Sequence, residues 1–166
     1  FYSKVYRLPE DTSEKVLLAL IDQLNHDDKF HGLLVQLPLP EHINEEKVIN
    51  AISSQKDVDG FLPENLGALM IGEKSFVPCT PKGCLELIKQ TGIPISGKKA
   101  VVVGRSNIVG KPIAMMLLQE NATVTICHSK TQNLKEELLS ADIVVAAVGK
   151  AHFITGDMVK EGAVII

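Results

Sequence analysis

The second half of the chain alternates short apolar segments with helical segments, and this alternation constrains the fold more than any other feature. Four strand-like runs, KAVVVG, ATVTICH, DIVVAAVG and GAVII, follow one another from residue 99. Helices are expected between them at 111–120, 133–140 and roughly 155–160. Strands that alternate with helices form a parallel sheet, and a sheet covered on both faces needs almost continuously apolar strands. The sequence therefore predicts an α/β fold with a Rossmann-like parallel sheet.

The first half shows a less regular α/β pattern. Asp11, followed by Glu14 three residues later, can form a capping box at the start of a helix. The run GLLVQLP at 32–38 is typical of a short buried parallel strand. Asn44 can cap a second helix, and Thr80-Pro81 can begin another, with threonine as the cap and proline at the first helical position.

A segment typical of a linker, IPISGKK, separates the two patterns. We therefore expect residues 1–93 to form part of a smaller, substrate-facing α/β domain and residues 94–166 to form the Rossmann-like domain. The chain is expected to be cut at both ends. It begins with FYSKVYRLPE, which has no initiating methionine, and it ends with EGAVII, inside a strand-like run.

Composition excludes several classes of protein. No apolar run reaches about eighteen residues, so we expect no membrane span. The net charge of −3 and the lack of a basic stripe argue against a nucleic-acid-binding protein. The five histidines lack metal-ligand spacing, so we expect no metal site. The three cysteines form no CxxC pair, which fits a reducing compartment such as the cytoplasm. Cys79 and Cys84 are expected to pack in or near the core.

The loop GRSNIVGKP, at 104–112, has the composition of an anion-binding loop. Gly104 ends the first strand of the regular half and permits a tight turn, and Gly110 permits close approach of the backbone. The following helix would direct its free N–H groups and the positive end of its dipole at the loop. Arg105 adds a cation, and Ser106 adds a hydrogen-bonding group. An ordinary glycine-containing turn is the alternative, because the GxGxxG spacing is absent.

The next strand ends in CHSKT, which contains no acidic residue. NAD-binding folds usually place Asp or Glu at this point to accept hydrogen bonds from the ribose 2′-hydroxyl. Ser129 and Lys130 would instead tolerate a 2′-phosphate, which Arg105 could also reach. This pattern favours NADP over NAD, although a polar turn after a strand is also common.

Several motifs together resemble the bifunctional methylenetetrahydrofolate dehydrogenase/cyclohydrolase family. They are GLLVQLPLP, KDVDGF, PCTPKGC, GRSNIVGKP and TVTICHSKT, in the family's order, spanning residues 32 to 131. The resemblance implies a two-domain α/β enzyme, commonly a homodimer, that uses NADP. It implies oxidation of methylenetetrahydrofolate by hydride transfer to the nicotinamide, followed by hydrolysis of the methenyl product to formyltetrahydrofolate.

The resemblance also assigns two residues to the catalytic, folate-facing cleft. Gln36 matches a glutamine that orients a catalytic lysine, and Asp59 matches an aspartate that binds the pterin ring. A carboxylate can accept both the amino group and the ring N–H of a pterin. The alternatives are a structural hydrogen bond for Gln36 and a turn before Gly60 for Asp59. Asp57 is expected to be a turn residue.

One element of the family pattern is missing. The family carries a Tyr-x-x-x-Lys pair ahead of the first matched motif, and this chain shows no candidate for that lysine. Two other interpretations therefore stay open. One is a different two-domain NADP dehydrogenase of the shikimate type, and the other is a catalytically dead nucleotide-binding or dimerisation module.

Overall fold

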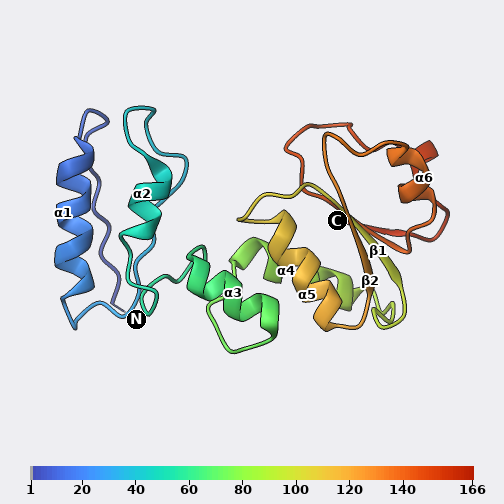
Figure 1. Cartoon of the computed structure of the whole chain (residues 1–166), viewed down its shortest axis with the longest axis horizontal. Helices are drawn as coiled ribbons and strands as arrows, with labels where there is room; N and C mark the ends of the chain where they lie inside the picture. The colour runs from blue at the N-terminus through green and yellow to red at the C-terminus, as the bar shows by residue number, and fades with distance from the viewer. Residues whose placement is uncertain (1) are drawn as a thin grey trace. The chain divides into compact units, whose positions relative to one another are not determined.

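The computed structural model describes residues 2–166 and divides the chain into two compact units, Phe1–Val58 and Asp59–Ile166 (Figure 1). This division does not coincide with the boundary expected at residues 93 and 94. Helices α3, Pro63–Ile71, and α4, Cys79–Gln90, belong to the second unit, because they contribute to the apolar cluster beneath its sheet.

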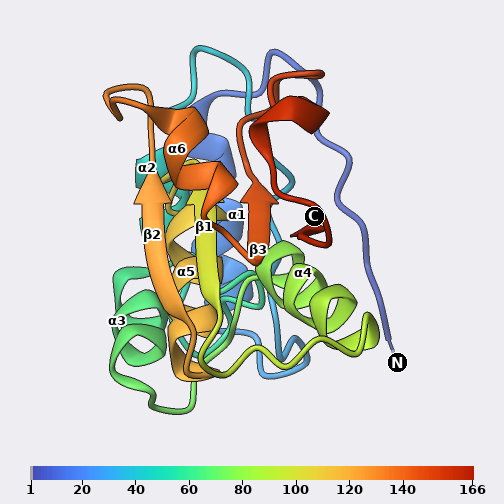
Figure 2. The same ribbon diagram turned by 90° about the vertical axis from the view of Figure 1, so that its right-hand side faces the viewer.

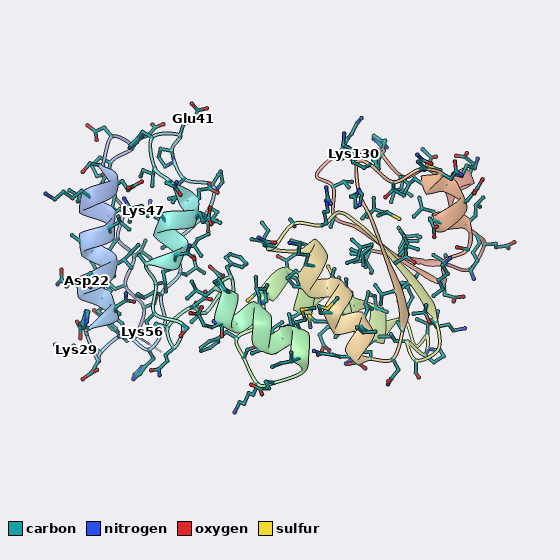
Figure 3. The ribbon with its side chains drawn as sticks, viewed as in Figure 1. Asp22, Lys29, Glu41, Lys47, Lys56 and Lys130 are labelled. Carbon is teal, nitrogen blue, oxygen red and sulfur yellow. The ribbon has the colours of Figure 1, made fainter. Side chains whose placement is uncertain are left out.

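The first unit is built on two helices, α1 at Glu14–Asn25 and α2 at Glu45–Asn50, which lie side by side in Figure 1. Their apolar faces form one core, whose buried members are Leu17, Ile21, Leu24, Leu33, Ile43, Val48 and Ile52. Lys47, labelled in Figure 3, also joins the helices through an ion pair with Glu14.

The helix caps of this unit confirm one expectation and correct another. Asn44 caps α2 as expected, because its Oδ1 accepts a hydrogen bond from the Lys47 N–H at 2.9 Å. The expected cap at Asp11 is wrong. The N-cap of α1 is Ser13, and Glu14, expected at the third helical position, is instead the first helical residue.

The strand expected at 32–38 is also wrong. The segment makes only an isolated parallel bridge between Leu33 and Asp57, in which the Leu33 N–H donates to the Lys56 carbonyl at 2.7 Å. Leu34 is 60% exposed. A parallel strand forms only where a neighbouring strand pairs with several of its residues. Within the described residues only the short stretch around Asp57 pairs with this one.

The second unit contains the predicted parallel sheet. Its strands are β1 (Lys99–Val103), β2 (Thr123–Cys127), β3 (Ile143–Ala146) and β4 (Val164–Ile165), and they lie in the order β2-β1-β3-β4, all parallel. Figure 2 shows β2, β1 and β3 side by side. The Rossmann-like α/β prediction is thus confirmed, and the near-continuous apolar runs are explained by burial of β1 and β3 on both faces.

Helices cover the two faces of this sheet. The helix α5, Gly110–Gln119, packs with α3 and α4 against one face, and α6, Leu134–Leu139, packs against the other. In Figure 2, α6 lies on the near side of the sheet and α5 lies behind it. The helix expected at 155–160 is only a single 3₁₀ turn, Gly156–Met158.

Two helix assignments in the middle of the chain also differ from expectation. The helix α3 was not predicted, although Pro63 at its first turn and Gly72, with φ of +81°, at its end are typical boundary signals. The helix α4 begins at Cys79 with Pro78 as its N-cap, so the expected cap at Thr80 is wrong. Thr80 already lies inside the first turn.

The strand order identifies where a ligand would bind to the sheet. The chain leaves β1 towards β2 on one side and returns to β3 on the other, so the direction of winding reverses between β1 and β3. In open parallel sheets, ligands bind at the carboxyl ends of the strands where this reversal occurs.

Candidate functional site

The loops that follow β1 and β3 touch at the carboxyl edge of the sheet, and glycine makes that contact possible. A Cβ atom on Gly104 would lie 2.3 Å from the carbonyl oxygen of Ala147, the residue after β3. Gly104 also has φ of +126°, which L side chains rarely adopt. A Cβ on Gly110 would lie 2.3 Å from the Gly104 carbonyl oxygen. The two glycines therefore permit close contact between the backbones of these loops at the start of α5.

The residues between these glycines form the turn that leads into α5. The Ser106 Oγ accepts hydrogen bonds from the N–H groups of Val109, at 3.2 Å, and Gly110, at 3.3 Å. Ser106 therefore organises the start of α5, although we expected it to contact the cofactor directly. Arg105 is exposed, and among residues 2–166 its guanidinium has no hydrogen-bond or ion-pair partner. Its donors are available to a ligand.

The turn after β2 lies beside this loop because of the register of the sheet. Val103 pairs with Cys127, and the Gly104 N–H donates to the Cys127 carbonyl at 2.8 Å. Arg105 and Ser129 each lie two residues beyond this matched pair. The structure therefore brings the two predicted recognition residues to the same edge of the sheet, and both are exposed.

The electrostatics of this edge suit an anion. Neither the loop at 104–112 nor the stretch at 127–131 contains Asp or Glu. Arg105 and Lys130 are cations, and Figure 3 shows Lys130 in the loop beyond β2. A planar guanidinium next to a hydroxyl and an ammonium matches the oxygens of a phosphate better than a neutral ribose hydroxyl.

Two parts of this site were missed by sequence reasoning. Ala147 lies opposite Gly104. Its position could have been inferred from the third predicted strand, because in a sheet of this order the carboxyl end of β3 lies beside that of β1. Thr131 closes the turn that carries Ser129 through a side-chain hydrogen bond. No periodicity reveals such a bond, because it depends on the conformation of four consecutive residues.

Gln36 lies in the first unit and is exposed. Its amide therefore does not need a hydrogen-bond partner within the protein. Its Nε2 donates to the carbonyl of the adjacent Leu37 at 2.9 Å. Gln36 also lines an open cavity of about 890 Å³ whose wall includes Tyr6, Leu33 and Val35. Because Gln36 makes only this local bond, its amide can form a hydrogen bond with another polar group in the cavity.

Asp59 begins the second unit and is half-buried. The backbone next to it is tightly held. Gly60 has φ of +67°, and a Cβ there would lie 2.5 Å from the Phe76 carbonyl oxygen. Asp57 is only 1% exposed and pairs with Leu33 in the parallel bridge, so it is a buried bridge residue and not merely the turn residue that we expected.

Two of the cysteines, Cys84 and Cys127, are poorly suited to act as nucleophiles. Burial raises the pKa of the Cys84 thiol and of the Cys127 thiol, so both stay protonated near neutral pH. Cys84 packs against the apolar cluster as expected. The expectation for Cys79 is wrong, because Cys79 is exposed at the start of α4, where the helix has just left the preceding loop.

Residues 2–166 contain no group of three or more His, Cys, Asp or Glu side chains that could hold a metal ion. No helix among them is long and apolar enough to cross a membrane.

Comparison with family models matches both units. Residues 1–59 match the catalytic domain of tetrahydrofolate dehydrogenase/cyclohydrolase, and residues 78–166 match the NAD(P)-binding domain of the same family. The chain is 66% identical over 165 residues to the bifunctional protein FolD of Moorella thermoacetica, covering 99% of this chain and 59% of that protein. It is 58% identical over 163 residues to FolD of Bacillus subtilis, covering 98% of this chain and 58% of that protein.

Solved structures agree with this match. The chain superimposes on the bifunctional FolD methylenetetrahydrofolate dehydrogenase/cyclohydrolase of Campylobacter jejuni with a TM-score of 0.92 and 49% identity, covering 96% of this chain and 57% of that one. The corresponding enzyme of Trypanosoma brucei, solved with NADP and an inhibitor, gives a TM-score of 0.89 and 38% identity, covering 95% and 55% of the two chains. The chain thus spans somewhat more than half the length of these relatives. With both domain models matched in order, it belongs to the tetrahydrofolate dehydrogenase/cyclohydrolase family.

Proposed function

We propose that the protein carrying this chain interconverts one-carbon tetrahydrofolates. It oxidises methylenetetrahydrofolate to methenyltetrahydrofolate with NADP and hydrolyses the product to formyltetrahydrofolate. The observation that carries this proposal is the match of both domains of the family, in order, along one chain. The names of the FolD relatives, which are 58 to 66% identical, support it.

The residues of the second unit fit a dinucleotide. Gly104 and Gly110 let the backbone of this loop pack closely at the start of α5, and a glycine-containing turn that leads into a helix N-terminus is a common place for a pyrophosphate to bind. Gly104, Gly110 and Ser106 would shape the phosphate loop, and Arg105 and Ser129 would contact the 2′-phosphate. When bound, the nicotinamide supplies the hydride acceptor for the dehydrogenase reaction.

Arg105 and Ser129 should determine the preference for NADP. Arg105→Ala should weaken NADP binding by about tenfold, a value that allows for solvent screening of an exposed site, and should change NAD binding by less than about twofold. Ser129→Asp should reduce NADP binding further, because a carboxylate repels the 2′-phosphate and can accept from a ribose hydroxyl. Calorimetric titration of both cofactors at fixed salt measures these changes. Wild-type protein that binds NAD as tightly as NADP would refute the assignment.

The folate-facing residues are Gln36 and Asp59. We propose that Asp59 accepts hydrogen bonds from the pterin ring and that Gln36 orients a catalytic group by hydrogen bonding. The single local bond of Gln36 and its place on a cavity wall support this role. Gln36 offers no charge to the substrate, so we expect it to affect kcat of the chemical step more than KM for the folate.

An activity assay tests the proposed function and the role of Gln36 together. The protein should reduce NADP only when methylenetetrahydrofolate is present, and should then form formyltetrahydrofolate. Gln36→Ala should lower kcat of the hydrolytic step by roughly tenfold or more, with a smaller change in KM for the folate. Absence of both reactions in the wild-type protein would contradict the proposed function, whereas a rise in KM with unchanged kcat would contradict only the role of Gln36.

We also propose a cytoplasmic homodimer without nucleic-acid or membrane partners. The three cysteines form no disulfide, which fits a reducing compartment. Exposed apolar side chains at the end of α3, Met70 and Ile71, lie near the end of α5, because Gln119 there donates to the Leu69 carbonyl. Apolar side chains gathered on a surface are typical of an interface between subunits.

A further inference from the structure

Three hydrogen bonds among His128, Lys130 and Thr131 close the turn after β2. The His128 N–H donates to the Thr131 Oγ1 at 2.8 Å, and the Thr131 N–H donates back to the His128 carbonyl at 2.8 Å. The Lys130 N–H donates to the His128 Nδ1 at 3.1 Å. Thr131 therefore holds both ends of a four-residue turn, once through its backbone and once through its hydroxyl.

Ser129 differs from the other residues of this turn in its hydrogen bonding. The backbone N–H groups of His128, Lys130 and Thr131 all have acceptors inside the turn. Ser129 is exposed, and within residues 2–166 neither its N–H nor its hydroxyl has a hydrogen-bond partner. The turn thus presents two unused donors on one exposed residue.

Thr131 also connects the turn to the sheet. Both of its bonds to His128 hold the residue that directly follows Cys127, which has no exposed surface at the end of β2. The Cys127 carbonyl in turn accepts from the Gly104 N–H, one residue before Arg105. One short chain of contacts therefore links the Ser129 turn to the loop that carries Arg105.

We propose that Thr131 is a positioning residue for recognition of the 2′-phosphate of NADP. It orients Ser129 beside Arg105, and it does not itself contact the cofactor. This inference rests on the proposed binding of the 2′-phosphate by Arg105 and Ser129. NAD has a hydroxyl at the 2′ position and gains little from an ordered Ser129, so loss of Thr131 Oγ1 reduces the affinity for NADP selectively.

The test compares Thr131→Val, which keeps the branched shape but lacks the hydroxyl, with Thr131→Ser, which keeps the hydroxyl. Calorimetric titration with NADP and with NAD, together with thermal unfolding, gives the readout. Thr131→Val should raise the Kd for NADP about three- to tenfold and leave the Kd for NAD within about twofold, and Thr131→Ser should restore the affinity for NADP. Thr131→Ala serves as a second hydroxyl deletion if the valine variant does not fold.

A matched control is available in the same unit. Thr91 also uses its hydroxyl in a local bond, to the Ile88 carbonyl at 2.7 Å, but it ends α4 before the chain enters the amino end of β1. Thr91→Val should leave the ratio of the two Kd values unchanged.

The possible outcomes distinguish the positioning role of Thr131 from the proposed 2′-phosphate site on which it rests. Equal weakening of NADP and NAD in Thr131→Val, or no change in either while Arg105→Ala still weakens NADP, overturns the positioning role alone. No preference for NADP in the wild-type protein, or no effect of Arg105→Ala, overturns the proposed 2′-phosphate site and this inference with it.

Discussion

Replacing Gly104 by alanine should destabilise the second unit strongly and remove cofactor binding. The new methyl group would lie 2.3 Å from the Ala147 carbonyl oxygen, and the backbone at φ of +126° is strained for any L side chain. Forcing this geometry costs about 1–3 kcal/mol for the backbone conformation, and displacement of the loop after β3 adds to it. We expect the free energy of unfolding to fall by about 2–4 kcal/mol, measured by urea denaturation.

Gly83→Ala is the matched control for this change. Gly83 lies within α4, nothing lies within 4 Å of a Cβ built there, and its φ is not in the left-handed region. Alanine favours a helix interior by up to about 1 kcal/mol relative to glycine, so this variant should be neutral or slightly more stable. If Gly104→Ala were as stable as Gly83→Ala and bound NADP normally, the close contact between the loops after β1 and β3 would be refuted.

The Rossmann-like half of the fold could be predicted because each of its elements carries its own signal. The strands β1 and β3 are buried on both faces, and this burial requires the apolar runs KAVVV and IVVA. Gly104 and Gly110 mark backbone contacts that no other residue permits. In this half the local pattern and the tertiary environment impose the same constraint, so the sequence alone identifies the sheet and the loop at its edge.

The first unit was harder to predict because its signals depend on neighbours. The run at 32–38 has the composition of a buried strand, yet only Leu33 pairs, with Asp57, and Leu34 stays exposed. An apolar, β-branched composition indicates that a segment lies in an apolar environment. A strand forms only where another strand supplies hydrogen bonds. The same limitation applies to Asp57, whose burial could not be inferred from a KDVDG motif that is typical of a turn.

For the proposed cofactor-recognition site, the sequence indicated the residues Arg105 and Ser129 but not the contacts that hold them in place. Arg105 and Ser129 follow from two strand ends and from the lack of an acidic residue near them. The register that places both at one edge depends on the paired backbones of Val103 and Cys127. The bond of the Thr131 hydroxyl that closes the turn depends on the conformation of residues 128–131. Sequence patterns indicate which residue types lie near a ligand, whereas strand register and hydrogen bonds within the loops determine how these residues are held.

Asp59→Ala should raise KM for the folate substrate by about ten- to a hundredfold, because it removes a charge-assisted acceptor for the pterin donors. Cofactor binding should change by less than about twofold, since the Arg105 loop and the Ser129 turn do not include Asp59. Steady-state kinetics with varied folate at saturating NADP, and calorimetric titration with NADP, measure the two effects. Asp59→Asn should fall between wild type and alanine, because an amide keeps one acceptor and loses the charge.

Asp28→Asn provides the control for removal of an aspartate charge, because Asp28 is exposed and lies beyond the end of α1. It should leave KM for the folate and the affinity for NADP unchanged. Thermal unfolding of Asp59→Ala separates an effect on substrate binding from an effect on folding. An unchanged KM for the folate in a folded Asp59→Ala protein would show that the carboxylate belongs to the structure of the turn and not to the substrate site.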